Sequence, residues 1–261
     1  MKVYLDHNLI VYLRKDLSQE LTEKIDKLKR NGCEFIFSPA HLEEVAVSFK
    51  RSGVSKEVVD SDIKFLTSLC HNNSLRPVTR DEVRYGTEYP KECYQRVIST
   101  YELNDIAETI DERVINDANK NPAGSPKEMN NLEPTKIFNH IHYIELTLLS
   151  LMNEGLITQS EATANLTKWP NLNLKDRFCV LAHSVNFAAN MLEKMGYFRE
   201  ETKKARSRLH DVTHMVYGRY ADIFVTNDTK LLKKTQAIYS LLGIPTLVLS
   251  MDEFIQGDVD A

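Results

Sequence analysis

Acidic residues from four distant parts of the sequence could hold one cation. Asp6 closes the apolar stretch KVYLD near the start of the chain, and Asp228 comes just after the apolar stretch DIFVT. The other acids are the adjacent pair Glu43 and Glu44, and Asp211. Carboxylates that gather without a counter-charge raise one another's pKa, which makes such a group unfavourable. Mg²⁺ or Mn²⁺ removes this repulsion and prefers oxygen ligands, so these acids predict a divalent-cation site if the fold brings them together.

The elements around the acids predict that they meet. Strands at 2–6 and 34–38 alternate with helices at 18–32 and 38–53, and the pattern returns near the C-terminus with a strand at 222–226. This alternation is typical of a parallel sheet with crossover helices. Ligands of such sheets bind at the carboxyl ends of the strands. We therefore expect all four acidic positions at one edge of the sheet.

A cation at this edge would support hydrolysis of a phosphodiester. A metal-bound water is more acidic than free water and can act as a nucleophile, while the cation stabilises negative charge on the phosphodiester. The residue types and their expected positions thus favour a metal-dependent phosphodiesterase.

Each acid also has a purely structural interpretation. Asp6 could form a turn, and Asp228 could cap the helix that follows it. The two adjacent glutamates could lie on a solvated helix face. Asp211 could pair with Lys204 or Arg208 on its own helix. The joint pattern favours a metal site, whereas no single acid does.

Three segments of the chain resemble the PIN domain, a member of the FEN-like nuclease superfamily that includes the VapC-type ribonuclease toxins. They are VYLDHNLI, FIFSPAHLEEVA and HDVTHMVYGRYADIFVTNDTKL. By position in these motifs, the resemblance assigns metal binding and catalysis to four acids: Asp6, Glu44, Asp211 and Asp228. Spacing from Ser38 favours Glu44 over Glu43, which stays an alternative.

The resemblance also assigns supporting roles around the acids. Asn8 and Thr226 would orient carboxylates through hydrogen bonds, as metal ligands require. His214, one helical turn after Asp211, would be a carboxylate partner or a substrate contact, with a core histidine as the alternative. Asp222 matches a frequent acid just before the last strand of the motif, and we expect it to be structural or to lie outside the ligand shell.

The resemblance implies an α/β fold, a three-layer sandwich around a central parallel sheet. It also implies Mg²⁺- or Mn²⁺-dependent endonucleolytic cleavage, usually of RNA, that leaves 5′-phosphate and 3′-hydroxyl ends. A toxin of this kind would need a partner antitoxin, and a second copy of the chain is an alternative partner. Two other functions stay open: a PIN- or FEN-like nuclease that acts on DNA, and a PIN-like scaffold that binds without cutting.

The middle of the chain has no counterpart in this resemblance. Residues 1–55 and 199–261 would form the two halves of a PIN-like core, and residues 56–198, where helical periodicity dominates, would form a long all-helical insertion. His140 and His142 lie in the most apolar helix of this insertion, at a spacing that places them on different faces. They therefore do not predict a joint metal site.

The charge of the chain restricts how it could bind RNA. A net charge of -4 and a pI near 6.1 argue against a protein that coats nucleic acid by bulk positive charge. One local basic run just before Asp211 could still contact phosphates. Its residues are Lys203, Lys204, Arg206 and Arg208, and the alternative is a solvated helix face.

The composition indicates a globular, cytoplasmic protein. The chain has 261 residues, of which 42% are hydrophobic and 27% charged, as is ordinary for a domain with a large core. Its four cysteines are scattered without a CxxC pair, so we expect reduced thiols and no zinc site. The strand pattern MKVYLD leaves no room for a signal peptide, and the most apolar helix is too short and too polar to span a membrane.

Overall fold

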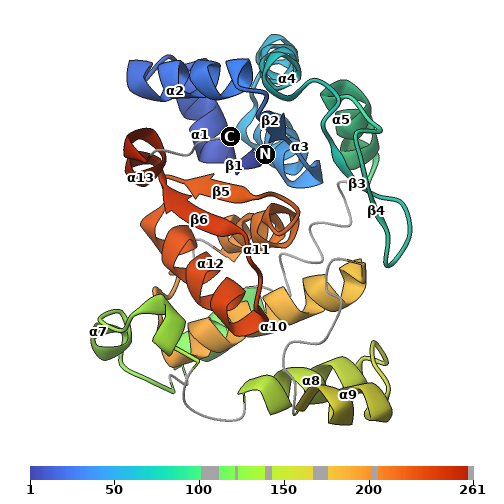
Figure 1. Cartoon of the computed structure of the whole chain (residues 1–261), viewed down its shortest axis with the longest axis vertical. Coiled ribbons are helices and arrows are strands. Elements are labelled where there is room, and N and C mark those ends of the chain that lie inside the picture. Colours follow the sequence, from blue (N-terminus) through green and yellow to red (C-terminus); the bar gives the residue numbers. More distant parts are fainter. Residues whose placement is uncertain (101–111, 121–122, 139–142, 167–175, 202–204, 258–261) are drawn as a thin grey trace.

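The computed structural model describes residues 1–100, 112–120, 123–138, 143–166, 176–201 and 205–257. It is a mixed α/β fold with a central sheet of four parallel strands (Figure 1). In spatial order, the strands are β2 (Glu34–Ile36), β1 (Lys2–Leu5), β5 (Ile223–Thr226) and β6 (Leu247–Ser250). The parallel sheet that the alternation of strands and helices predicts is confirmed.

The strand order reverses at β1. From β1 the chain crosses to β2 on one side, whereas β5, from the other end of the chain, pairs with β1 on the opposite side. Val3 pairs in register with Phe35 of β2 and with Ile223 of β5, so the three strands are aligned with one another. The carboxyl ends of β1 and β5 therefore lie side by side at a topological switch point, where open parallel sheets bind ligands.

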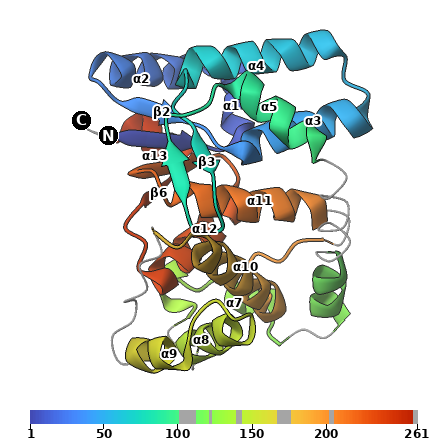
Figure 2. The same ribbon diagram turned by 90° about the vertical axis from the view of Figure 1, so that its right-hand side faces the viewer.

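Helices cover both faces of this sheet (Figure 2). Successive side chains of β1 point to opposite faces, so that Tyr4 packs in one buried cluster while Val3 and Leu5 pack in the other. The Tyr4 cluster includes residues of α10 (Phe178–Met195), α11 (Ala205–Gly218) and α12 (Thr229–Leu242). The opposite cluster includes α1 (His7–Arg14), α2 (Gln19–Arg30) and α4 (Lys56–Cys70).

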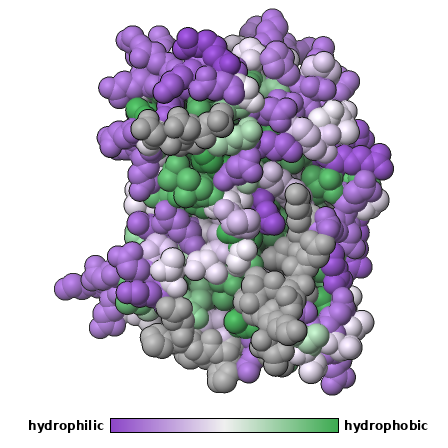
Figure 3. Space-filling model, in the orientation of Figure 1, coloured by the Kyte–Doolittle hydropathy of each residue, from purple (hydrophilic) through white to green (hydrophobic). Residues whose placement is uncertain are grey.

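The described residues contain further helices. These are α3 (Pro39–Ser52), α5 (Pro90–Ser99), α7 (Pro126–Met129), the 3-10 helix η1 (Pro134–Lys136), α8 (Tyr143–Asn153), α9 (Gln159–Leu166) and α13 (Met251–Gln256), and residues 112–120 are also helical. α8 and α9 lie at the opposite end of the molecule from α2 (Figure 2). Hydrophilic side chains cover the outer surface of α2 (Figure 3).

Capping residues explain where the expected helices begin and end. Ser18 accepts a hydrogen bond from the Leu21 N–H at 3.2 Å and begins α2. α3 has Ser38 at its N-cap and Pro39 in its first turn. It ends at Gly53, whose φ of 66° favours glycine. These limits of α2 and α3 agree with those that the sequence predicts.

The expectation that residues 56–198 are all helical is wrong. This segment contains a two-stranded antiparallel sheet of β3 (Leu75–Pro77) and β4 (Val83–Tyr85). Three-residue strands are too short to show an alternating pattern, and a bridge between Phe37 and Ser74 holds β3 beside the end of β2. α4 and α5 share a buried cluster with β1, so the packing is continuous across residue 55.

Other expectations concern thiols, membranes and the histidine pair. All four cysteines are free. Among the helices of the described ranges, none combines the length and the apolar character that crossing a membrane requires. His140 and His142 lie outside the described residues.

A buried group of charged residues joins α10 to α12. Lys234 of α12 is 4% exposed, and its Nζ lies 2.6 Å from Oε1 of Glu193 on α10 and 3.1 Å from Oε1 of Glu200. Lys230 donates to the other oxygen of Glu200 at 3.0 Å. Arg208 of α11 lies 3.5 Å from Glu193. A buried ammonium group depends on its carboxylate partners, so this group should contribute strongly to stability.

We expect Glu193→Gln to lower the free energy of unfolding by about 3 kcal/mol, because it leaves the Lys234 ammonium buried with one partner fewer. Urea unfolding of the full chain measures this loss. Glu20→Gln removes an exposed carboxylate of α2 and serves as the control, with little expected change. Equal midpoints for the two variants would contradict the role given to this ion group.

Candidate functional site

Asp6 and Thr226 join the carboxyl ends of β1 and β5. Asp6 is 1% exposed, and its Oδ1 accepts a hydrogen bond from the Leu9 N–H at 2.9 Å, which caps α1. Its Oδ2 accepts a hydrogen bond from the Thr226 hydroxyl. Burial raises the pKa of Asp6, while the hydrogen bonds from Thr226 and Leu9 oppose this shift. The Asp6 carboxyl is thus held in place at the switch point.

Asp228 lies beside this pair, at the N-terminus of α12. Its Oδ1 accepts hydrogen bonds from the N–H groups of Lys230 at 2.7 Å and Leu231 at 3.0 Å. Its own N–H donates to Thr226 Oγ1 at 3.0 Å, so Thr226 connects Asp228 to Asp6. Asp228 is therefore a helix cap through one oxygen. No hydrogen bond from the described residues reaches its second oxygen.

Asp211, in α11, is half-buried and lies near other charged groups of this edge. Burial raises the pKa of Asp211 well above its usual value. The carboxylates of Asp228, Glu44 and Glu200 act in the same direction, and only the Lys234 ammonium opposes them among its main neighbours. Within the described residues, no group donates a hydrogen bond to this carboxyl. Ionising a half-buried carboxyl beside other carboxylates is unfavourable, and a bound cation would relieve this repulsion.

Of the two adjacent glutamates, Glu44 faces the other acids. Its Oε1 lies 2.8 Å from Nε2 of His214, and its charge acts on both Asp6 and Asp211. Burial raises the pKa of Glu44, but the nearby histidines and the hydrogen bond from His214 outweigh it, and the pKa lies below its usual value. Burial raises the pKa of Glu43. Glu44 thus contacts His214 and lies near Asp6 and Asp211.

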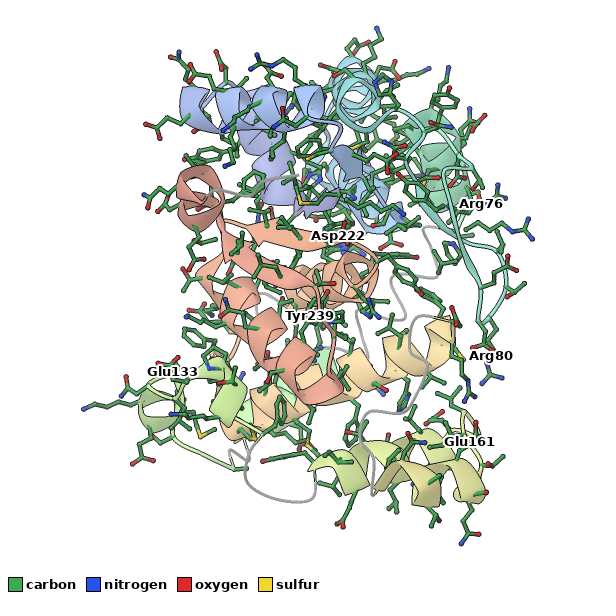
Figure 4. The ribbon with its side chains drawn as sticks, in the orientation of Figure 1. Arg76, Arg80, Glu133, Glu161, Asp222 and Tyr239 are labelled. Atoms are coloured by element: carbon green, nitrogen blue, oxygen red, sulfur yellow. The ribbon has the colours of Figure 1, made fainter. Side chains whose placement is uncertain are left out.

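The structure does not bring every expected residue into contact with these acids. Asn8 is exposed in the first turn of α1, and it makes no hydrogen bond to a carboxylate of the described residues. Asp222 lies at the opposite end of β5, where its Oδ2 accepts a hydrogen bond from the Lys2 N–H at 2.7 Å (Figure 4). There it joins β5 to β1 at the amino edge of the sheet, which is a structural role.

Of the basic run, the structure describes the side chain of Arg208. This side chain is 2% exposed, donates a hydrogen bond to Asn190 and lies beside Glu193. Arg208 is therefore not on an open surface that phosphates could reach. Lys203 and Lys204 lie outside the described residues, as does the side chain of Arg206.

The side chains of the site have the ligand chemistry that a hard divalent cation prefers. Asp6, Glu44, Asp211 and Asp228 offer only carboxylate oxygens, the ligands that Mg²⁺ and Mn²⁺ prefer. The unpartnered carboxyl of Asp211 is the group that a cation would satisfy. In the described ranges, however, no three His, Cys, Asp or Glu side chains lie close enough together to hold a metal ion. The four acids are neighbours without a ready-made ligand shell, so side chains would have to move to complete one.

The sequence does not indicate several residues that surround these acids. Lys234 supplies the counter-charge of Asp211. Tyr4 and His41 surround His214, with the ring centroids of the two histidines 4.9 Å apart. A tyrosine in a buried strand is a signal that its hydroxyl needs a partner. The sequence does not show which residue is the hydrogen-bond partner of that hydroxyl.

No protein-family model matches the chain, and no match is found among curated proteins or among solved structures. The geometry of the site is therefore the basis for assigning a function.

Asp211→Asn should stabilise the metal-free protein near neutral pH. The pKa of Asp211 is raised by folding, so its ionisation costs stability as pH rises above its unfolded pKa of about 3.9. We expect the asparagine variant to melt about 2–4 °C higher at pH 7, the effect of roughly 1 kcal/mol in a chain of this size. The gain should shrink as pH falls towards about 4.

Calorimetric melting of both proteins across this pH range checks the expectation. Asp26→Asn, at an exposed position of α2, should show neither the gain nor its pH dependence. A lower melting temperature for Asp211→Asn at pH 7 would mean that the ionised carboxyl has a partner that holds the fold together.

Proposed function

We propose that this protein is a PIN-like endoribonuclease that hydrolyses RNA phosphodiester bonds with Mg²⁺ or Mn²⁺. The observation that carries the proposal is the Asp211 carboxyl, which is half-buried, receives no hydrogen bond from the described residues and lies near Asp228 and Glu44. A fold gains nothing in stability from such a group, so a cation that binds there is the simplest reason for it. Its place at the switch point of a parallel sheet supports a ligand site.

The four carboxylates that would bind this cation are held in different ways. Asp6 and Asp228 each have one oxygen fixed by backbone N–H groups, so both carboxyls are oriented before a ligand arrives. Glu44 is held by His214, and Asp211 completes the set. When bound, the metal would acidify a coordinated water and stabilise charge on the scissile phosphate.

RNA as the substrate rests on the resemblance of the three motifs to PIN domains. A related nuclease that cuts DNA is the runner-up, and a PIN-like scaffold that does not cut is the next alternative. Action as a toxin, with an antitoxin or a second copy of the chain as partner, would follow from the same resemblance. Growth arrest on expression in bacteria, relieved by Asp228→Asn, would support a toxin and fits a cytoplasmic enzyme.

We expect the purified protein to cleave single-stranded RNA when Mn²⁺ or Mg²⁺ is present, and to stop when EDTA is added. Asp6→Asn and Asp228→Asn should lower the cleavage rate by about 100-fold or more, because each removes a charged ligand. Asparagine still caps a helix, so both variants should stay folded. End-labelled RNA resolved on gels measures the rate.

Asp26→Asn is the matched control and should cut at the wild-type rate. Labelled DNA of the same sequence, tested in parallel, separates a ribonuclease from the runner-up. Cleavage that survives in both Asp6→Asn and Asp228→Asn would exclude the four-acid site. Binding of RNA without cleavage at any metal concentration would favour the scaffold.

Metal binding should also be visible without any substrate. A ligand that binds only the folded state stabilises it, by about 2.7 kcal/mol when its concentration is 100 times the dissociation constant. We expect Mn²⁺ to raise the melting temperature of the wild type and to have no such effect on Asp211→Asn. A melting curve of the wild type that does not respond to millimolar Mn²⁺ would count against the proposal.

A further inference from the structure

A series of hydrogen bonds connects Tyr4 of β1 to Glu44 of α3. Tyr4 is fully buried in β1, and its hydroxyl lies 2.7 Å from Ser38 Oγ and 2.7 Å from His214 Nδ1. His214 is 2% exposed, and its other nitrogen, Nε2, lies 2.8 Å from Glu44 Oε1. Tyr4 of β1, Ser38 at the N-cap of α3, His214 of α11 and Glu44 of α3 thus form one connected series.

The neighbouring His41 leaves these rings little freedom to turn. Its Nδ1 accepts a hydrogen bond from the Ser38 N–H at 3.1 Å, so its Nε2 donates to the Leu5 carbonyl at 2.8 Å. Burial, the largest cause, lowers the pKa of His41 to about 3, in keeping with this neutral ring. The ring centroid of His41 lies 4.8 Å from that of Tyr4 and 4.9 Å from that of His214. Both neighbours are therefore confined.

The donor and acceptor of each bond in the series follow from its last member. An ionised Glu44 only accepts, so His214 donates from Nε2. When the His214 ring carries a single proton, at Nε2, its Nδ1 accepts. Tyr4 then donates to Nδ1 and accepts from the Ser38 hydroxyl. The Tyr4 hydroxyl thereby fixes which nitrogen of His214 carries the proton that faces Glu44.

Glu44 needs this support more than Asp6 and Asp228 do. Backbone N–H groups hold Asp6 and Asp228, whereas Glu44 extends from the middle of the first half of α3. Among the described residues, His214 is the hydrogen-bond donor that reaches its carboxylate. A long side chain with one contact takes its position from that contact.

We propose that Tyr4 is a positioning residue. Its hydroxyl holds His214 in one tautomer and orientation, and His214 in turn holds the Glu44 carboxylate at the edge of the sheet where the cation would bind. This inference rests on the proposed function and names a group that acts on the metal through two other side chains. Groups that hold ligands in this way typically contribute about 10- to 100-fold to metal affinity.

The test compares two tyrosine variants in Mn²⁺ titrations of the full chain, followed by electron paramagnetic resonance. Tyr4→Phe should weaken Mn²⁺ binding by about 10-fold or more. Tyr239→Phe is the matched control, because Tyr239 is also buried and its hydroxyl donates to the Met215 carbonyl at 2.6 Å (Figure 4). It should bind Mn²⁺ like the wild type. Equal affinity for Tyr4→Phe and wild type would overturn the proposal.

A double-mutant cycle with His214→Gln separates positioning from a general loss of packing. If Tyr4 acts through His214, Tyr4→Phe should weaken Mn²⁺ binding no further once residue 214 is glutamine. Additive losses in the double variant would mean that the two residues act independently, against the proposal. If Tyr4→Phe does not fold, His214→Gln alone tests the series: it should weaken Mn²⁺ binding by about 10-fold or more, and wild-type affinity would overturn the proposal.

A spectroscopic measurement tests this proposal independently of the proposed function. If the wild type neither binds Mn²⁺ nor cleaves nucleic acid, the proposed function fails, and nitrogen NMR of the His214 ring still tests the series. The wild type should carry its proton on Nε2, and Tyr4→Phe should shift the ring towards a mixture of tautomers. An unchanged His214 spectrum in Tyr4→Phe would show that Tyr4 does not position the ring.

Discussion

The pairing of β1 with β5 is the constraint on which the site depends. These strands come from opposite ends of the chain, and their carboxyl ends are joined by the hydrogen bond from Thr226 to Asp6 and by the Asp6 N–H donating to the Val225 carbonyl at 3.0 Å. Parallel pairing makes both strands end at the same edge, so the residues that follow them become neighbours. Without this pairing, Asp6 and Asp228 would have no reason to meet.

Two carboxylates at this edge, Asp6 and Asp211, reduce the stability of the fold when they ionise. Burial raises the pKa of both Asp6 and Asp211, and Asp211 gains no hydrogen bond in return within the described residues. The fold offsets part of this cost through Lys234, which Glu193 and Glu200 hold in place. Because Glu193 belongs to α10, the same ions that tie the middle of the chain to α12 also supply the counter-charge for the site. Under the proposed function, one buried lysine would serve both the stability of the fold and the charge balance of the site.

The sequence predicts the elements that form the site better than the contacts inside it. Apolar spacing and caps such as Ser18 and Ser38 mark α2 and α3, because these signals are local in the chain. The sequence does not predict α1, because a single residue separates the start of this helix at His7 from the end of β1, and no loop lies between the two elements. The position of Asp222 follows from topology alone: a residue before a parallel strand lies at the amino edge, away from one that follows it. The hydrogen bond between Tyr4 and His214 spans 210 residues, and no local pattern encodes it.

The structural and functional interpretations of Asp6 and Asp228 turn out to be compatible. Both residues cap helices, α1 and α12, and capping uses one oxygen of each carboxyl. A carboxylate has about four lone-pair sites, so a cap can also accept a cation. Two helix N-termini, each with partial positive charge, therefore point at the same edge. They stabilise the acids there, and they also favour an incoming phosphate that the acids alone would repel. In a protein of net charge -4, an edge that combines carboxylates with helix N-termini is compatible with the proposed binding of both a cation and a phosphodiester.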